Sequence, residues 1–475
     1  MLSGRHPASP AAGMPRGLRI GLLHVLLLAI LVRLCAFLVF EDTFDFVLTG
    51  QIHGSEAYDT YAVNLVRTGV FGRTPSVADS AIPPLYAYTL GLIYAAFGRG
   101  AFQVLFLNIL LDVLSIAFLA DVGRRLFPQG RTVGLLAGLA LALYPYLVFQ
   151  TLTLIDTPLF GALLNAFIWI VVIVRERART DGSTVAVAAA GGVVLGLATL
   201  TRPVLAPLAL LIPAWFLFRR SWRDTILRLA PIALFGAAVV GVWTFRNERV
   251  YGRFLPITST AGSNFWQGNS PLVIPLLRAG YDVQWTAPDS LAADDPRSPE
   301  ADEERFHLAW TFLREHPDQI GELLWVKLLT QWSIDVAPRF NPNESTGPIV
   351  DVPGRAEGFE TPSLSDSDPI NLYSQPLFDR FGRWLHRLVW GSLFLLAVAG
   401  SFLARRQWRD VSLIWFLELS MTAAYVVFHP ATRYRAPGDP MLFLLSAFAV
   451  VRLWVWARAR RATLQKPNPA SPSPS

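Results

Sequence analysis

The chain has 475 residues, of which 53% are hydrophobic and 16% are charged, and its formal net charge is +6. Soluble globular chains carry about 25% charged residues, so this composition excludes an ordinary soluble protein. The positive charge does not indicate nucleic-acid binding, because the basic residues stand in short clusters beside apolar blocks, and we expect no nucleic-acid partner. The single cysteine, Cys35, excludes a disulfide within the chain.

The apolar blocks are long enough to cross a hydrocarbon core of about 30 Å. The first, 18–40, has no small-residue cleavage site and exceeds the apolar core of a signal peptide, so we interpret it as a spanning helix. Further blocks follow at 101–122, 132–150, 157–174, 184–201, 203–218, 229–245, 384–404, 411–428 and 441–456. Two shorter blocks, 83–97 and 320–332, suit interfacial or re-entrant helices. The sequence therefore predicts an all-α polytopic membrane protein with about ten transmembrane helices.

The basic residues test this count. They form five clusters: Arg124, Arg125 and Arg131; Arg175, Arg177 and Arg179; Arg219, Arg220, Arg223 and Arg228; Arg405, Arg406 and Arg409; Arg458, Arg460 and Arg461. With a cytoplasmic N-terminus, ten spans place every cluster on the cytoplasmic side, as the positive-inside bias requires. An eleventh span at 83–97 would place them all outside. The loops 41–100, 151–156, 246–383 and 429–440, with residue 202, are then expected on the outer side.

This topology divides the chain into four parts. Residues 1–245 form a transmembrane module with the first outer loop, 41–100, which we interpret as catalytic, and residues 246–383 form a large outer loop domain of mixed structure. Residues 384–457 carry the C-terminal transmembrane helices, and 458–475 form a disordered cytoplasmic tail. In the large loop, Ser298 followed by Pro299 predicts the start of a helix.

The first outer loop is rich in carboxylates and predicts amphipathic helices. Ser55 can cap a helix whose apolar face has the spacing of Tyr58, Tyr61, Ala62 and Leu65. Glu56 and Asp59 lie three residues apart, so their carboxylates occupy neighbouring positions of its first turn. Complementing the helix dipole is the simpler explanation for such a pair taken alone.

Other outer-side residues favour a binding site for an anion. Asp156 stands in the short loop L-I-D-T-P-L, and Arg202 stands between two apolar blocks in L-T-R-P. Four more follow in chain order: Arg246, Asn247, Arg433 and Arg435, with Tyr434 between the last two. Headgroup binding or snorkelling explains any one such arginine. Several arginines on the side that the positive-inside bias depletes, together with carboxylates, indicate an anionic partner such as a membrane-embedded phosphate ester.

The order of these pieces resembles the GT-C glycosyltransferases, specifically the family 39-like transferases that use lipid-linked sugars, such as protein mannosyltransferases and aminoarabinose transferases. The matching pieces are Y-x-x-x-A-x-N-L at 58–65, P-P-L-Y at 83–86, D-T-P at 156–158, T-R-P at 201–203, R-N at 246–247 and R-Y-R-x-P at 433–437. Each motif is weak alone, whereas their order and common side are more specific. The sequence departs from the family where Ser55 replaces a frequent aspartate, so Glu56, Asp42, Asp45 and Asp59 all stay open as the base.

The resemblance implies a glycosyltransferase that moves a sugar from a polyprenyl-phosphate donor to a hydroxyl acceptor, which can be a protein, a lipid or a glycan. It implies a multi-pass protein of the bacterial plasma membrane, in contact with membrane lipids, with its active site on the outer face. The expected catalytic residues are Glu56, Asp59 and Asp156. The expected phosphate-binding residues are Arg433, Arg435, Arg202 and Arg246, with Tyr58, Tyr434 and Asn247 as further substrate contacts. No metal-ligand spacing is evident, so no cofactor is predicted, and a divalent metal stays open.

Two other classes stay open at this point. A transporter or flippase is expected to carry ionisable groups near the middle of the bilayer, and Arg33, Asp112 and Glu418 lie inside predicted spans. A structural pair between Arg33 and Asp112 is the simpler reading of the first two. A non-catalytic membrane protein related to the GT-C enzymes is the third class, and Ser55 gives it some weight.

Overall fold

The structure is a computed structural model that describes residues 21–39, 55–338 and 381–464, apart from 285, 289, 290, 294, 296 and 297. Within these ranges the regular structure is helical, which confirms the predicted all-α class. Residues 1–20, the part of the first outer loop before Ser55, the segment 339–380 and the tail 465–475 lie outside the described residues.

Eight of the described helices are long and apolar enough to cross a membrane. They are α1 (Leu22–Val39), α4 (Ala101–Leu126), α7 (Thr157–Glu176), α8 (Gly182–Thr201), α10 (Trp222–Tyr251), α15 (Arg383–Leu403), α16 (Trp408–Val427, preceded by the 3-10 turn η4, Arg405–Gln407) and α18 (Asp439–Leu464). The bent pair α5 (Gly130–Leu143) and α6 (Pro145–Thr151) gives a ninth span if it is counted as one. The tenth predicted block corresponds to α9 (Ala206–Leu217), whose 12 residues are too few to span a bilayer alone.

The bend between α5 and α6 shapes the region that leads to the candidate site. The two helices meet at an angle of 60°, and Pro145 is the first residue of α6. Proline has no backbone N–H to continue a helix, and its ring clashes with the carbonyl four residues earlier, so the straight span predicted over 132–150 is interrupted here. The chain after α6 turns through buried residues and delivers Asp156 to the start of α7.

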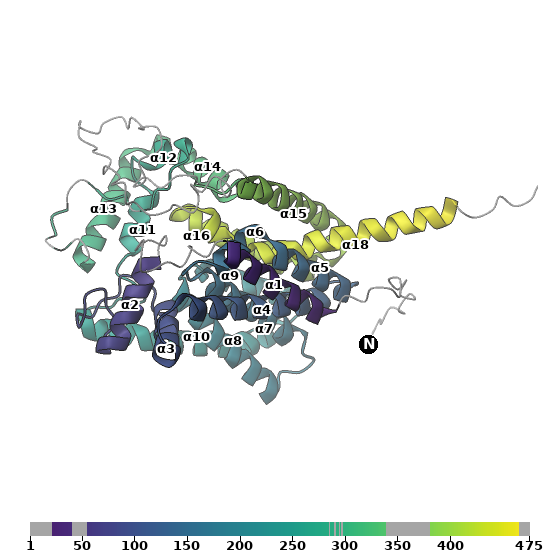
Figure 1. Cartoon of the computed structure of the whole chain (residues 1–475), viewed down its shortest axis with the longest axis horizontal. Helices are drawn as coiled ribbons and strands as arrows, with labels where there is room; N and C mark the ends of the chain where they lie inside the picture. Colours follow the sequence, from purple (N-terminus) through teal and green to yellow (C-terminus); the bar gives the residue numbers. More distant parts are fainter. Residues whose placement is uncertain are drawn as a thin grey trace, which may run out of the picture.

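The remaining helices gather mainly at one end of the bundle (Figure 1). The first outer loop supplies α2 (Ser55–Thr68) and α3 (Pro84–Phe97). The large loop supplies α11 (Ala261–Gly268), α12 (Val273–Ala279), α13 (Pro299–Glu315), the short 3-10 turn η2 (Pro317–Gln319) and α14 (Ile320–Gln331), and α17 (Thr432–Arg435) precedes α18. The predicted cap is confirmed, since the Ser298 side chain accepts from the backbone N–H of Ala301 at 3.1 Å. The described part of 246–383 contains no strand, so the expected mixed structure is replaced there by helices.

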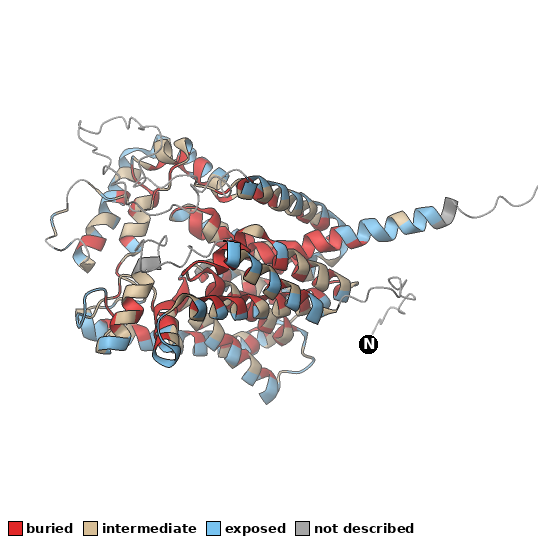
Figure 2. Ribbon diagram, viewed as in Figure 1, coloured by how far each residue is buried: buried red, intermediate tan, exposed pale blue. Residues whose placement is uncertain are grey.

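Close backbone contacts hold the spanning helices together. A Cβ at Gly134 of α5 would lie 2.1 Å from the carbonyl oxygen of Ala120 in α4, and one at Gly192 of α8 would lie 2.5 Å from that of Ile232 in α10. Small residues allow helices to approach in this way inside a membrane, where packing rather than water exclusion drives their association. Figure 2 shows the buried residues concentrated where these helices meet.

The last helix departs from its predicted end. Helix α18 is buried over much of its first half, becomes largely exposed after Val451, and continues to Leu464 (Figure 2). Residues 458–464, which the sequence analysis assigned to a disordered tail, are therefore helical. The apolar residues on the exposed half include Leu453, Trp454 and Trp456, which suit contact with lipid.

The topology leads to a first prediction. Figure 1 places α2 and α11–α14 at the end of the molecule opposite the free end of α18. In a Cys35-free background, single cysteines at Ser76 and Glu315, both exposed, should therefore be labelled from the same compartment by an impermeant reagent. A cysteine at the exposed Arg223 should be labelled from the other compartment. Labelling of positions 76 and 315 from opposite sides would contradict the predicted arrangement.

Candidate active site

Asp156 and Arg202 form a buried ion pair at the centre of the candidate site. Asp156 precedes α7 as its N-cap residue, and Arg202 ends α8 as its C-cap residue. The guanidinium donates to both carboxylate oxygens, from Nε to Oδ2 at 2.7 Å and from Nη2 to Oδ1 at 2.6 Å. The two side chains are 6% and 8% exposed, respectively. A bidentate pair at this depth is strong and geometrically specific, so it fixes the start of α7 against the end of α8.

Arg202 uses further donors to position neighbouring groups. Its Nη2 also donates to Oγ1 of Thr157 at 2.9 Å, and its Nη1 donates to the backbone carbonyl of Arg433 at 3.1 Å. The second contact joins α8 to α17. Most N–H groups of the Arg202 guanidinium are therefore engaged within the protein, and Arg202 supports the R-Y-R segment. The predicted direct contact with a donor phosphate would have to use a remaining N–H group.

Two predicted substrate contacts, Tyr58 and Tyr434, lie beside this pair. Burial, and then the Asp156 carboxylate, raise the pKa of the Tyr58 hydroxyl well above its usual value, so Tyr58 stays a hydrogen-bond donor toward Asp156. The Tyr434 ring lies 5.8 Å from Cζ of Arg202 and stacks on Tyr425 at a centroid distance of 4.9 Å. We call Tyr58, Asp156, Arg202 and Tyr434 the Asp156 cluster. It joins residues of α2 and α17 to the start of α7 and the end of α8.

Arg433 lies next to this cluster and is more accessible than Arg202. Its side chain is 21% exposed and its Nη2 donates to Oδ2 of Asp282 at 2.9 Å. The neighbouring Tyr434 hydroxyl donates to Oε1 of Gln284 at 3.2 Å and lies 3.1 Å from Nε2 of His429. Burial lowers the pKa of His429 to about 4, so its ring is neutral at neutral pH. The large outer loop therefore reaches the candidate site through Asp282 and Gln284.

Asp59, a predicted catalytic residue, is engaged by α3 and the residues that follow it. The Tyr94 hydroxyl donates to its Oδ1 at 2.8 Å, and Nη2 of Arg99 donates to its Oδ2 at 2.7 Å. Both carboxylate oxygens therefore hold α2 onto this neighbouring segment. A general base needs a lone pair directed at the substrate, so these contacts favour an anchoring role for Asp59.

Arg246 and Asn247 hold outer loops rather than lining the cluster. Arg246 donates from Nη2 to the carbonyl of Phe71 at 2.9 Å and from Nη1 to the carbonyl of Asp79 at 2.7 Å. Asn247 donates from Nδ2 to two carbonyl oxygens of the segment 255–257, at 3.1 and 3.0 Å. The R-N motif thus ties the first outer loop and the start of the large outer loop to the end of α10. Direct substrate contact by either residue stays a prediction.

Arg435 is buried among helices. Its Nε donates to Oδ1 of Asp439 at 3.0 Å, and its Nη1 donates to the carbonyls of Gln331 and Ser333, each at 3.0 Å. Its Cζ lies 3.9 Å from the ring centroid of Trp390. Because the side chain is 1% exposed, the predicted contact with a donor phosphate would require α14, α15 and α18 to move apart.

Known families and structures share features with this chain. A family model described as dolichyl-phosphate-mannose-protein mannosyltransferase matches residues 81–245, a segment that contains the P-P-L-Y, D-T-P and T-R-P motifs. No curated protein sequence matches the chain significantly. The structure resembles the archaeal oligosaccharyltransferase AglB from Archaeoglobus fulgidus in complex with an inhibitory peptide and a dolichol-phosphate, with a TM-score of 0.53 and 15% identity. That match covers 96% of this chain and 52% of the AglB chain.

The chain has the GT-C fold. The apo form of AglB gives a similar match, with a TM-score of 0.52 and 14% identity over 95% of this chain and 53% of that one. The present chain thus spans about half the length of AglB. ArnT from Cupriavidus metallidurans bound to undecaprenyl phosphate is 17% identical over 94% of this chain and 81% of that one, with a TM-score of 0.39, too low to support an argument. The GT-C resemblance inferred from the motifs is confirmed by the family segment and the fold.

The base predicted for this chain falls at the edge of the described residues. Glu56 belongs to the first turn of α2, one residue after Ser55, as predicted, and its side chain lies outside the described residues. Asp42 and Asp45 lie in the segment 40–54, which is outside them entirely. The assignment of the base therefore stays a prediction.

Several residues around the site were missed by sequence reasoning. Asp282 stands in the middle of the large loop without a recognisable motif, and only the fold brings it to Arg433. Asp79 accepts from the Tyr61 hydroxyl and from the backbone N–H of Arg73, so it closes the turn after α2. Lys327 of α14 is buried and donates to Oδ1 of Asn269 at 3.0 Å, and burial lowers its pKa to about 7. Of these three residues, only Lys327 could have been noticed in the sequence, because it is a lysine within an apolar helix.

The described residues contain no group of three or more His, Cys, Asp or Glu side chains arranged to hold a metal ion.

The spanning helices contain the predicted ion pair, in which Nε of Arg33 donates to Oδ2 of Asp112 at 2.7 Å. Arg33 further donates from Nη1 to the carbonyls of Ala29 and Ala142, at 3.2 and 3.0 Å. These contacts link α1, α4 and α5 as a structural pair is expected to do, which weakens the transporter alternative.

Proposed function

We propose that this protein is a membrane glycosyltransferase that moves a sugar from a polyprenyl-phosphate-linked donor to a hydroxyl group of an acceptor on the outer face of the membrane. The observation that carries the proposal is the Asp156 cluster. It brings together Tyr58 of the first outer loop and the D-T-P, T-R-P and R-Y-R motifs. In the sequence these pieces are spread from Tyr58 to Tyr434. The presence of dolichol-phosphate in the AglB structure supports a donor of this chemical class.

The accessible arginine next to the cluster is the best candidate for the donor phosphate. The Arg433 side chain is 21% exposed and pairs with Asp282, whereas Arg202 and Arg435 are almost fully buried in internal pairs. A guanidinium can bind phosphate oxygens through two parallel hydrogen bonds. We assign Arg433 to the phosphate, with Arg202 and Asp156 positioning its backbone and Tyr58 and Tyr434 bordering the substrate.

The reaction that we propose requires one base and one cationic group. A carboxylate, for which Glu56 is the candidate, accepts the proton of the acceptor hydroxyl while the hydroxyl oxygen attacks the anomeric carbon. The bond from the anomeric carbon to the phosphate oxygen breaks, and the polyprenyl phosphate leaves with the electron pair. Arg433 stabilises the negative charge that develops on that phosphate. A single displacement of this kind inverts the anomeric centre.

The proposed function can be tested on membrane lipids. Cells that lack the protein should accumulate a polyprenyl-phosphate-linked sugar relative to cells that produce it, because the donor is no longer consumed. Lipid extracts from the two strains, compared by mass spectrometry, measure this directly. Complementation with the wild-type chain should reverse the accumulation. Identical profiles of lipid-linked sugars in the two strains would count against the proposed donor.

A second test concerns the phosphate contact. Arg433→Ala should weaken binding of a polyprenyl-phosphate about 10-fold to 100-fold, because a charge-assisted contact to phosphate is worth roughly 1.5–3 kcal/mol. The matched control is Arg253→Ala, which removes an arginine that is 40% exposed and paired with Glu300 and Glu303 in the same outer region. Titration of the purified proteins with the lipid measures both affinities. Equal affinities for the two variants would remove Arg433 from the site.

A further inference from the structure

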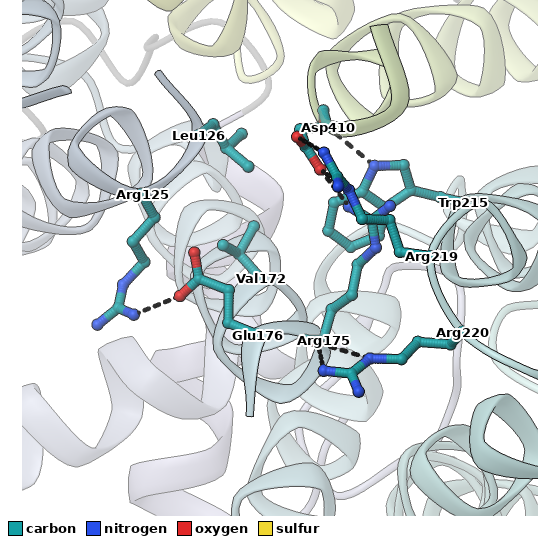
Figure 3. A pocket seen from close by; sticks show the side chains of 9 residues that line it. All are labelled: Arg125, Leu126, Val172, Arg175, Glu176, Trp215, Arg219, Arg220 and Asp410. Carbon is teal, nitrogen blue, oxygen red and sulfur yellow. Dashed lines mark hydrogen bonds and ion pairs between the residues drawn. The ribbon is translucent and has the colours of Figure 1, made fainter. Parts of the chain in front are cut away.

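A cavity lies between the helix ends at the other end of the bundle from the Asp156 cluster. It has a volume of about 300 Å³ and is lined by the end of α4 (Arg125, Leu126), the end of α7 (Val172, Arg175, Glu176), α9 and the turn after it (Trp215, Arg219, Arg220), and Asp410 of α16 (Figure 3). Asp156 directly precedes α7 and Glu176 ends it, and the 20 residues of this helix correspond to roughly 30 Å. The cavity is therefore separate from the candidate active site.

The lining of this cavity is basic. It contains four arginines but only two carboxylates, Glu176 and Asp410. Arg219 pairs with Asp410, from Nη2 to Oδ2 at 2.5 Å, and Arg125 pairs with Glu176 at 2.6 Å. The carboxylates hold the arginines in place around the cavity, as Figure 3 shows. Outside the lining, Asp121 also pairs with Arg125 and Asp224 with Arg220. Each of these two carboxylates is shared with a second arginine, Arg124 or Arg228, so six arginines stand against four carboxylates. An excess of positive charge around a defined space favours an anion.

Arg175 carries an additional sign of a missing partner. Its side chain is 6% exposed, and its guanidinium lies 3.7 Å from the ring centroid of Trp215. It donates from Nη2 to the backbone carbonyl of Arg409 at 2.9 Å and from Nη1 to Asp410 at 3.2 Å, whereas its Nε is buried without a hydrogen-bond partner. Leaving a buried charged donor unsatisfied is costly, so an acceptor in the cavity would stabilise this arrangement.

We propose that this cavity binds a phosphate group, carried either by an anionic lipid headgroup or by a free phosphate ion. Arginine forks match phosphate oxygens geometrically, and basic pockets between the ends of membrane helices suit lipid headgroups. A volume of about 300 Å³ is roughly ten times the share of one water molecule in the liquid, so it admits a phosphate with part of its hydration. The site is distinct from that proposed for the sugar donor and does not depend on glycosyltransferase activity.

Binding to the purified full-length protein in nanodiscs of phosphatidylcholine tests this proposal. One arm titrates phosphatidylglycerol and counts the bound lipids by native mass spectrometry, and the other titrates inorganic phosphate by calorimetry. Arg219→Gln should weaken binding about tenfold, since it removes one charge-assisted contact. The matched control is Arg223→Gln, which removes an exposed arginine from the same end of the bundle but outside the cavity lining. If Arg219→Gln does not fold, Arg125→Gln replaces it.

The outcomes separate the two sources of phosphate and the competing explanation. If Arg219→Gln loses phosphatidylglycerol binding and Arg223→Gln keeps it, the result supports a site for a lipid headgroup. The same pattern for inorganic phosphate alone supports a site for a free ion. Equal loss in both variants would show a diffuse basic surface, and absence of binding in both arms would show a purely structural ion-pair network. Either of these last two results would overturn the proposal.

Discussion

Replacing Asp156 by alanine should lower the free energy of unfolding by about 3–5 kcal/mol and remove most of the transferase activity. The substitution leaves the Arg202 guanidinium at 8% exposure without its counter-charge, and an uncompensated buried charge is strongly destabilising. It also removes the carboxylate beside Tyr58, so α2 loses a contact with the start of α7. Arg202 in turn donates to the carbonyl of Arg433, and the disturbance should therefore reach α17.

A paired replacement separates the two effects. Asp156→Leu combined with Arg202→Met removes both charges, so the thermal midpoint should recover toward that of the wild type while activity stays low. The matched control is Glu303→Ala, which removes one carboxylate from an exposed pair with Arg253 and should cost less than about 1 kcal/mol. Thermal unfolding and sugar transfer are measured on the same membrane preparations. An alanine variant at Asp156 as stable as Glu303→Ala would contradict the role given to the pair, as would full activity in the double variant.

The spanning helices could be predicted because the membrane imposes a simple rule on sequence. A hydrocarbon core requires a continuous apolar block in which the backbone satisfies its own hydrogen bonds, and each predicted block coincides with a helix. This rule does not predict whether an apolar block forms one straight helix or is broken into shorter ones. The bend before Pro145 and the short length of α9 arise from local backbone chemistry and packing, which total hydropathy does not register. Pro145 was a visible signal for the first of these.

The residues of the Asp156 cluster could be found in the sequence, but their roles could not. Sidedness separates outer arginines from cytoplasmic ones, and the T-R-P, R-N and R-Y-R motifs then select Arg202, Arg246, Arg433 and Arg435 among the outer ones. What distinguishes them is the partner that each meets: a buried carboxylate, the carbonyls of a loop, the partly buried Asp282, or the buried Asp439. Asp439 lies four residues after Arg435, but the partners of the other three arginines lie 46 to 175 residues away in the chain, so no local pattern encodes them.

The contacts also divide the motifs into two kinds. D-T-P and T-R-P are joined directly by the Asp156–Arg202 pair, and both fall within the segment that matches the family model. The loop tyrosine and R-Y-R lie outside that segment and reach the pair from α2 and α17. We infer that the buried pair is a fixed platform, and that substrate selection depends on the outer elements placed on it.

Changing Glu56 to glutamine should reduce turnover about 10²-fold to 10⁴-fold while the affinity for the lipid-linked donor is nearly kept. The amide keeps the size of the side chain but cannot accept the proton of the acceptor hydroxyl. Glu56 lies in the first turn of α2, two residues before Tyr58, which belongs to the Asp156 cluster. The other carboxylate of this turn, Asp59, is already engaged by Tyr94 and Arg99, and Asp156 is held by Arg202, so neither is available in the same way.

The competing explanation is that Glu56 only complements the dipole of α2, which is worth about 0.3–1 kcal/mol. In that case Glu56→Gln should change turnover by a few-fold at most and lower thermal stability slightly. Glu315→Gln on the exposed surface of α13 is the matched control for the change in charge. Steady-state turnover and donor affinity, measured for both variants, distinguish the two roles. An active Glu56→Gln with an inactive Asp45→Asn would move the base to the start of the first outer loop, and activity in Asp42→Asn, Asp45→Asn, Glu56→Gln and Asp59→Asn alike would contradict the enzyme assignment itself.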